Sequence, residues 1–380
     1  MAGIYIHIPF CKQACHYCNF HFSTSLRYKN ELLAALLKET ALQQDYLSNE
    51  TVDTIYFGGG TPSLLTISEL RSQFDKIRET FNVLNDAELT LEANPDDITD
   101  ERLSGWKETR INRLSIGVQS FFEEDLQWMN RAHNAKQAID NLQLAIQQFD
   151  NITIDLIYGH PLLTNEKWKQ NVDKIIALNI PHISCYALTV EPKTPLHKMI
   201  LEKKKEDVQQ EKQAEQFLLL MQWLEEAGYE HYEISNFAKP GFRSRHNSSY
   251  WQGKKYLSLG PSAHSFNGTS RQWNISNNTI YIESLAKDKI PFEKEILTAA
   301  QQLNEYIMTS LRTVEGLDLK RVRNFESAVR SSDPIAMGFG VRSQKFIDAG
   351  KMILKENKLI LTKEGKLFAD GIAAELFVDS

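Results

Sequence analysis

The first 190 residues of this 380-residue chain alternate short β-branched or aromatic runs with longer amphipathic stretches. Parallel strands need a long crossover, usually a helix, so this alternation predicts repeated βαβ units. Helices are expected between the strands, for example over Tyr28 to Leu47 and Ala135 to Phe149. The expected strands are Gly3 to Ile8, Thr54 to Phe57, Glu88 to Glu92, Arg113 to Val118, Ile152 to Tyr158 and His182 to Leu188. Six such units predict an α/β fold, a partial (β/α)6 barrel.

The pattern changes after the sixth expected strand. A long charged helix is expected over about Glu202 to Gly228, and a stretch rich in glycine, proline and serine follows over Lys239 to Ser265. Such a stretch is typical of a domain border, so we expect a core domain over residues 1–235 and a second domain over residues 236–380. The second domain has the pattern helix, turn, helix, hairpin over Lys355 to Gly365, and helix. This order predicts a winged-helix-like α+β domain that packs against the first.

Composition and charge limit the classes of function. The 49 acidic residues outnumber the 43 basic ones and give a net charge of −6. Nucleic-acid phosphates favour a basic face, so no nucleic-acid partner is expected. The N-terminus carries no basic leader, and no segment approaches 18 unbroken apolar residues, so a cytoplasmic protein is expected.

Three of the four cysteines lie within eight residues, directly after the first expected strand. They are Cys11, Cys15 and Cys18. Thiols this close together in a reducing compartment favour metal binding over a disulfide. Three thiolates on a four-iron cluster leave one iron with an open coordination site. The alternative is a structural zinc site, whose fourth ligand would come from Cys185, His16 or His21.

Glycines and polar residues follow the next expected strands. The segment Gly58-Gly-Gly-Thr-Pro62 follows the second strand, and its glycines let backbone groups approach a ligand closely. Glu92, Gln119, Arg131 and Asp155 lie on or after later strands, where buried polar groups need partners. Barrel folds place reactive groups at these carboxyl ends, so a ligand site is predicted there. A tight turn at the glycines and structural hydrogen bonds at the other residues are the alternatives.

Five ordered motifs together resemble the oxygen-independent coproporphyrinogen III oxidase family of radical S-adenosylmethionine (SAM) proteins. They are Tyr5-Ile-His-Ile-Pro-Phe-Cys11, the three-cysteine loop, Gly58-Gly-Gly-Thr-Pro, Arg113-Leu-Ser-Ile-Gly-Val-Gln119-Ser-Phe and Ile154-Asp-Leu-Ile-Tyr-Gly. The resemblance covers nearly the whole chain. It implies a TIM-like radical SAM barrel that carries a [4Fe-4S] cluster and SAM.

The resemblance also implies roles for individual residues. Cys11, Cys15 and Cys18 would hold the cluster, and Tyr5 would belong to the cofactor site. Around SAM, Tyr17 and Ala187 would flank the adenine, Gly59, Gly60, Thr61 and Glu92 would bind the methionine end, Arg131 the carboxylate, and Gln119 and Asp155 the ribose hydroxyls. These roles suit the residue types, because a guanidinium pairs bidentately with a carboxylate and carboxylate or amide oxygens accept from hydroxyls.

Two departures from the oxidases indicate a branch of this family. The oxidases carry a long segment before the first strand and a further cysteine two residues after the third cluster ligand. Here the first expected strand begins at Gly3, and Phe20 stands at that position. Both features resemble the HemW branch, whose members are heme chaperones. The segments His246-Asn-Ser-Ser-Tyr-Trp251 and Leu259-Gly-Pro-Ser-Ala-His-Ser265 are also similar to that branch.

The resemblance implies that His246 and His264 lie near bound heme. An imidazole beside tyrosine and tryptophan could supply an axial iron ligand and an apolar wall for the porphyrin. The alternative is a helix cap or core cluster in which His246 and Asn247 satisfy backbone groups. The rival ligands to His246 are His7, His133, His160 and His264, and the sequence does not rank them.

The sequence therefore predicts a heme chaperone that transfers heme to an apoprotein, a membrane-bound respiratory hemoprotein reached by transient membrane contact. One alternative is an enzyme that oxidatively decarboxylates coproporphyrinogen III with SAM in the absence of oxygen, so whether the chain is an enzyme stays open. A third hypothesis is a transcription regulator that senses through the cluster and binds DNA with its winged-helix-like tail.

Overall fold

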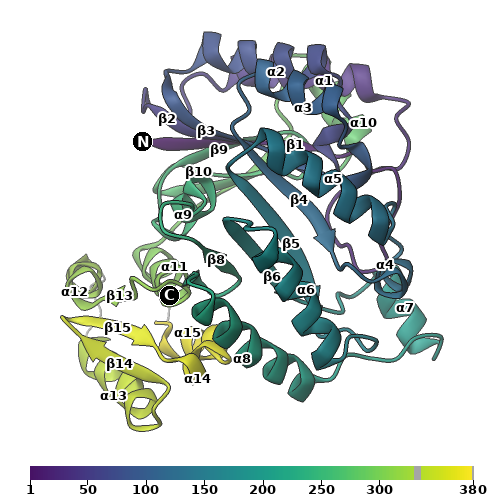
Figure 1. Cartoon of the computed structure of the whole chain (residues 1–380). Helices are drawn as coiled ribbons and strands as arrows, with labels where there is room; N and C mark the ends of the chain where they lie inside the picture. The colour runs from purple at the N-terminus through teal and green to yellow at the C-terminus, as the bar shows by residue number, and fades with distance from the viewer. Residues whose placement is uncertain (329–334, 379–380) are drawn as a thin grey trace.

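The computed structural model describes residues 1–328 and 335–378, and one large sheet organises most of them (Figure 1). Six neighbouring strands of this sheet run parallel in chain order, which confirms the predicted βαβ units. They are β1 (Ala2–Ile8), β2 (Val52–Gly59), β3 (Val83–Ala93), β4 (Arg113–Gln119), β5 (Ile152–Tyr158) and β6 (His182–Ala187). The first four are longer than predicted, β5 matches, and β6 ends one residue early. Since β1 and β6 do not pair with each other, the barrel is partial.

Helices in the connections cover the outer face of these strands, which are therefore buried on both faces (Figure 1). Two of the helix starts are fixed locally by capping boxes, at Thr66 with Glu69 and at Asn134 with Gln137. The covering helices are α1 (Lys29–Leu42), α2 (Ile67–Thr80), α3 (Asp100–Glu108), α5 (Ala135–Gln148), α6 (Asn165–Ala177) and α8 (Gln210–Glu226). Within the described ranges, none of the helices combines the length and apolarity that crossing a membrane requires.

Two short helices, α4 (Glu123–Met129) and α7 (Pro195–Leu201), lie in the connections that follow β4 and β6. The long charged helix predicted from Glu202 is wrong over residues 202–209, because α8 begins only at Gln210. Lys203 has a φ of 57°, which continues no right-handed helix. The Lys205 ammonium donates to the carbonyl of Trp128, so a tertiary contact holds this segment away from helical geometry.

The large sheet continues on both sides of the parallel strands. On the β6 side it adds β8 and β7, and on the β1 side it adds β9, which runs parallel to β1, and then β10 to β12. The added elements are β7 (Glu230–Glu233), β8 (Asn236–Ala238), α9 (Arg245–Trp251), β9 (Tyr256–Leu259), β10 (His264–Phe266), β11 (Ser270–Asn274), α10 (Asn278–Ala286) and β12 (Phe292–Ile296). The border expected near residue 235 falls inside this sheet, while the division into two domains stays a prediction.

A separate hydrophobic core begins at Ala300. It lies around a small antiparallel sheet of order β13-β15-β14, and this arrangement of helices and strands is winged-helix-like, as predicted. Glu356 and Asn357 both have positive φ, which suits the tight turn of the hairpin between β14 and β15. The elements are α11 (Ala299–Leu311), β13 (Leu317–Asp318), α12 (Leu319–Ala328), α13 (Ile335–Asp348), β14 (Met352–Lys355), β15 (Lys358–Leu361), α14 (Lys363–Lys366) and α15 (Ala369–Leu376). The turn expected between α12 and α13 lies outside the described residues.

A buried carboxylate ties the first helix to the later strands. Glu39 on α1 is fully buried and accepts hydrogen bonds from the backbone N–H of Gly260 at 2.8 Å, from Asn274 Nδ2 at 2.6 Å and from the Tyr281 hydroxyl. Burial raises the pKa of Glu39 to about 7. This one side chain satisfies three donors from the loop after β9, from β11 and from α10.

Replacing Glu39 with Ala should therefore destabilise the fold strongly, because three buried donors lose their acceptor. We expect a loss of about 3 kcal/mol in the free energy of unfolding, measured by urea denaturation. The matched control is Glu283→Ala on α10, whose side chain is exposed. That change should stay within about 0.5 kcal/mol. Equal losses in the two variants would contradict a special role for Glu39.

Candidate functional site

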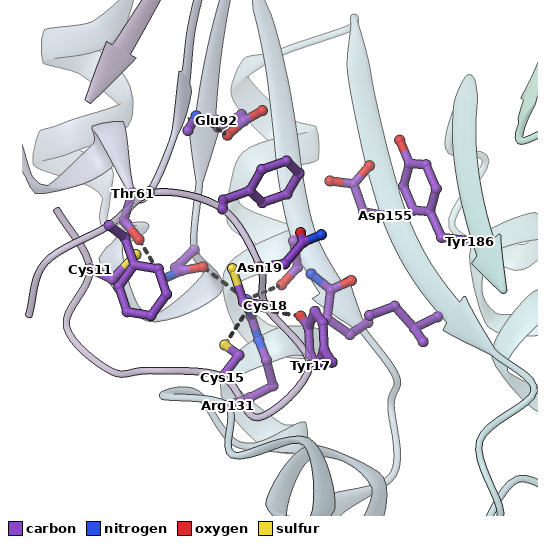
Figure 2. A pocket seen from close by; sticks show the side chains of 18 of the residues that line it. Cys11, Cys15, Tyr17, Cys18, Asn19, Thr61, Glu92, Arg131, Asp155 and Tyr186 are labelled. Carbon is purple, nitrogen blue, oxygen red and sulfur yellow. Dashed lines mark hydrogen bonds between the residues drawn. The ribbon is translucent and has the colours of Figure 1, made fainter. Parts of the chain in front are cut away.

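A cavity of about 460 Å³ opens at the carboxyl ends of the parallel strands. All but three of the predicted site residues line it, and Figure 2 shows several of them facing one another across it. The predicted residues that line the cavity are Cys11, Cys15, Tyr17, Cys18, Gly59, Gly60, Thr61, Glu92, Gln119, Arg131, Asp155 and Ala187. The exceptions are Tyr5, His246 and His264.

The three cysteines lie on the irregular loop between β1 and α1, and all are free thiols. The backbone N–H of Cys11 donates to the carbonyl of Ser23 at 3.0 Å, and that of Cys18 donates to the carbonyl of Cys15 at 3.3 Å. Burial raises the pKa of Cys11 to about 11 and also raises that of Cys18. Thiolates at these positions therefore need a bound cation.

The guanidinium of Arg131 lies beside Cys15 and Tyr17 of this loop (Figure 2). Its Nη1 lies 3.3 Å from Cys15 Sγ and 3.4 Å from the Tyr17 hydroxyl, and its Nη2 donates to Asn94 Oδ1 and to the carbonyl of Gly117, both at 2.9 Å. Burial opposes its charge, but Tyr17 and Cys15 outweigh burial and raise the pKa of Arg131. The buried Nε–H is left without an acceptor in the described chain.

Glu92 and the glycine loop form the wall next to β2 and β3. Glu92 Oε1 accepts from the Tyr56 hydroxyl at 2.8 Å, and Oε2 accepts from the backbone N–H of Gly59 at 3.1 Å. Burial raises the pKa of Glu92 to about 7, and the neighbouring Asp155 adds to the rise. Gly59 has a φ of 106°, and a Cβ on Gly60 would lie only 2.6 Å from the carbonyl oxygen of Phe10. The loop therefore keeps bare backbone against the cavity.

The opposite wall carries Asp155 on β5 and Tyr186 on β6 (Figure 2). Asp155 Oδ2 accepts from the Ser115 hydroxyl at 3.5 Å, and burial raises its pKa to about 6. Gln119 ends β4 with a φ of 66°, a left-handed conformation that is uncommon for a residue with a side chain. The wall offers carboxylate, amide and aromatic groups to one ligand.

Some residues that orient these groups carry no motif that predicts them from the sequence. Asn94 accepts from Arg131, Tyr56 donates to Glu92, and Tyr186 lines the cavity. Asn94 and Tyr56 lie within two residues of the motif residues Glu92 and Gly58, and this closeness in sequence is the one feature that could have indicated a role at the site. No pattern in the sequence shows that Tyr56 reaches across to β3.

The ligand set of the zinc alternative is not assembled. Cys185 is buried in β6 and does not line the cavity. His16 Nδ1 lies 3.1 Å from the carbonyl of Trp128, and His21 Nε2 lies 2.8 Å from Asn278 Oδ1. Over residues 1–328 and 335–378, no group of three or more His, Cys, Asp or Glu side chains could hold a single metal ion. Three thiols without a fourth ligand suit a cluster better than zinc.

His246 lies in a buried cluster away from the cavity. Its Nδ1 lies 2.8 Å from the Thr54 hydroxyl near the start of β2, and its Nε2 lies 2.9 Å from the Tyr250 hydroxyl. Burial lowers its pKa to about 3, so the ring is neutral. Its backbone N–H donates to Glu88 at 2.9 Å, as does that of Arg245 at 3.1 Å. An axial ligand needs a free ring nitrogen, so this environment favours the alternative in which His246 satisfies buried groups.

The other predicted and rival residues differ in accessibility. Tyr5 packs behind the glycine loop, where its ring lies 5.9 Å from that of Tyr56. His264, at the start of β10, is exposed, and its ring stacks 6.2 Å from that of Trp273. The other rival histidines are all buried, namely His7, His133 and His160. His264 is therefore the accessible histidine among those considered for heme.

Two family models match the chain. The radical SAM superfamily model matches residues 5–190, and the HemN C-terminal domain model matches residues 297–368. The first match covers the parallel strands with their cavity, and the second begins near the start of the separate hydrophobic core.

Curated relatives match over nearly the full length. Heme chaperone HemW from Bacillus subtilis is 33% identical and the alignment covers 98% of each chain, and heme chaperone HemW from Mycobacterium tuberculosis H37Rv is 32% identical over 98% of this chain and 94% of its own. A solved structure, the coproporphyrinogen III oxidase HemN of Escherichia coli, described as a radical SAM enzyme, superposes with a TM-score of 0.85 at 22% identity. That match covers 99% of this chain and 90% of the other and supports the fold.

Replacing any one of Cys11, Cys15 or Cys18 with Ala should abolish most of the iron and acid-labile sulfide bound after anaerobic reconstitution, because a cluster held at three corners loses a ligand. The measurement is iron and sulfide per chain, with the brown absorbance of the cluster. The control is Cys185→Ala, a buried thiol outside the cavity, which should keep full iron. Full iron and sulfide in a loop variant would contradict the ligand assignment.

Proposed function

Because the chain belongs to the heme chaperone HemW family, we propose that it binds heme and transfers it to an apoprotein. The observation that carries this proposal is the 33% identity to a heme chaperone over 98% of both chains. A local feature agrees with it. Phe20 lies at the cavity, 68% exposed, where the oxidases are expected to carry a further cysteine.

The radical SAM match implies a [4Fe-4S] cluster and SAM, and the residues of the cavity suit both. Cys11, Cys15 and Cys18 would hold the cluster, since they are the three thiols of the cavity lining. When bound, the cluster supplies one-electron chemistry to SAM at its open iron. Arg131 stabilises negative charge near Cys15 and would place its positive charge beside the carboxylate of SAM.

The remaining cavity residues suit the polar parts of SAM. Glu92 presents a carboxylate to the methionine amino group, and the bare backbone of the glycine loop lets that end approach closely. Gln119 and Asp155 offer acceptors to the ribose hydroxyls, and Tyr17 provides a flat apolar face for the adenine. These residues bind and orient SAM and exclude water from it.

We assign the heme contact to His264 rather than to His246. The exposed His264 ring stacks on Trp273, which offers an apolar face to a porphyrin. Partial burial and the nearby Arg271 lower the pKa of His264, which favours the neutral imidazole that binds iron. His246, in contrast, has partners at both ring nitrogens.

The acceptor in this proposal is a membrane-bound respiratory hemoprotein. The chaperone works in the cytoplasm and contacts the membrane surface only during delivery. The absence of a membrane-crossing helix among the described residues is compatible with transient contact.

A heme titration of the reconstituted protein, followed by its Soret band, tests the chaperone proposal. We expect saturable binding near one heme per chain. His264→Ala should weaken binding at least tenfold because the axial ligand is lost, whereas His246→Gln, which retains polar groups at the buried position, should bind heme like the wild type. No saturable binding, together with SAM-dependent loss of carboxyl groups from coproporphyrinogen III, would replace the chaperone by the decarboxylating enzyme.

Replacing Arg131 with Met should weaken SAM binding at least tenfold, because a charge-assisted contact to the carboxylate contributes about 1.5–3 kcal/mol. The measurement is equilibrium dialysis of SAM against protein with a measured iron content. Arg102→Met is the control, because Arg102 donates to the carbonyl of Ser63 and does not line the cavity. Unchanged SAM affinity in Arg131→Met would assign Arg131 a structural role.

A further inference from the structure

Tyr56 does not line the cavity, yet it holds one of the groups that do. Its hydroxyl donates to Glu92 Oε1 at 2.8 Å, while the other oxygen of Glu92 accepts from the backbone N–H of Gly59 at 3.1 Å. The two hydrogen bonds come from β2, and they fix a carboxylate that β3 supplies. The orientation of Glu92 therefore depends on a side chain outside the cavity lining.

The ring of Tyr56 is itself held in place. It stacks 5.0 Å from His246 on one side and lies 5.9 Å from the ring of Tyr5. His246 is fixed in turn by Thr54 and by the Tyr250 hydroxyl. The segment from His246 to Trp251 thus holds Tyr56 in place, and Tyr56 in turn holds Glu92 at the cavity.

We propose that Tyr56 is a positioning residue that holds Glu92 ionised and aimed at the methionine amino group of SAM. This inference rests on the proposed function, because it takes Glu92 as the partner of the methionine amino group. A phenol that donates to a carboxylate stabilises the charged form of that carboxylate. Without it, burial alone would favour the protonated form, which is a weaker acceptor for the N–H bonds of that amino group.

The charged and titratable groups around Glu92 come from several elements. Burial raises the pKa of Glu92 to about 7, and repulsion by Asp155 on β5 adds to the rise. The hydrogen bonds from Tyr56 and Gly59 lower the pKa of Glu92. Tyr5 on β1, Tyr186 on β6 and Tyr250 on α9 also face it, and each has a pKa raised above its ordinary value by burial, so these phenols stay neutral. Among the described residues, Tyr56 is the one whose side chain donates a hydrogen bond to Glu92.

The test is the pH dependence of SAM binding in Tyr56→Phe, measured by equilibrium dialysis with cluster-reconstituted protein from pH 6 to pH 9. Ionised Glu92 is the stronger acceptor for the N–H bonds of the SAM amino group, so affinity is retained above the pKa of Glu92 and lost as the pH falls through it. Removing the hydroxyl raises that pKa, so the midpoint should move up by about one pH unit. We expect SAM affinity about fivefold below the wild type at pH 7 and restored at pH 9.

Two further variants make the result decisive. Tyr229→Phe also removes a buried phenol hydroxyl, one that donates to the carbonyl of Ile180 at 2.5 Å, and it should keep the wild-type midpoint. Glu92→Gln should bind SAM weakly, without the step that Glu92 contributes. The amino group of SAM titrates equally in all variants, so it cancels in the comparison. Melting temperature and iron content establish that each variant is folded.

The outcomes separate this inference from the proposed function. A wild-type pH profile in Tyr56→Phe beside weak binding in Glu92→Gln would overturn the role of Tyr56 and leave the SAM site standing. Wild-type SAM binding in Glu92→Gln would instead overturn the proposed SAM site and the inference with it. A weakening in Tyr56→Phe that is equal at pH 7 and pH 9 would indicate a merely structural role and would also overturn the inference.

Discussion

Parallel pairing of β1 to β6 is the constraint on which the site depends. In a parallel sheet every strand ends at the same edge, so the residues that follow β1, β2, β3, β4 and β5 meet although more than a hundred residues separate them along the chain. Each connecting helix buries its apolar face on the sheet and returns the chain to the opposite edge. The cavity therefore collects polar groups from every unit, and the hydrophobic core beneath it carries the stability.

Burying the carboxylates of Glu92 and Asp155 in one cavity raises the pKa of both, and nearby hydrogen-bond donors partly offset this rise. Glu92 and Asp155 lie close enough to repel each other, and Arg131 lies among neutral acceptors rather than against a carboxylate. A ligand that carries both an N–H donor and an anionic group would compensate the two carboxylates and the guanidinium at once.

The sequence was informative where chemistry is local and uninformative where it depends on distant pairing. The cysteine loop and the glycine loop were identified because several special residues lie within a few positions of one another. The link from Tyr56 to Glu92 and the burial of His246 depend on which strands become neighbours, and no local pattern encodes that. Residue 235 lies between β7 and β8 of the large sheet, and the division into two domains stays a prediction.

The position of β9 has a consequence for how the chain is made. β1 pairs with β2 on one side and with β9 on the other, in a register that joins Gly3 to Tyr256, and the loop after β9 packs Gly260 against the backbone of His7. A ribosome releases the N-terminal strand long before its second neighbour exists. Until residue 259 has emerged, the edge of β1 lacks that partner, and such an edge recruits other strands. Assembly of the cysteine-bearing end of the barrel is thus completed late in translation, by a segment more than two hundred residues downstream.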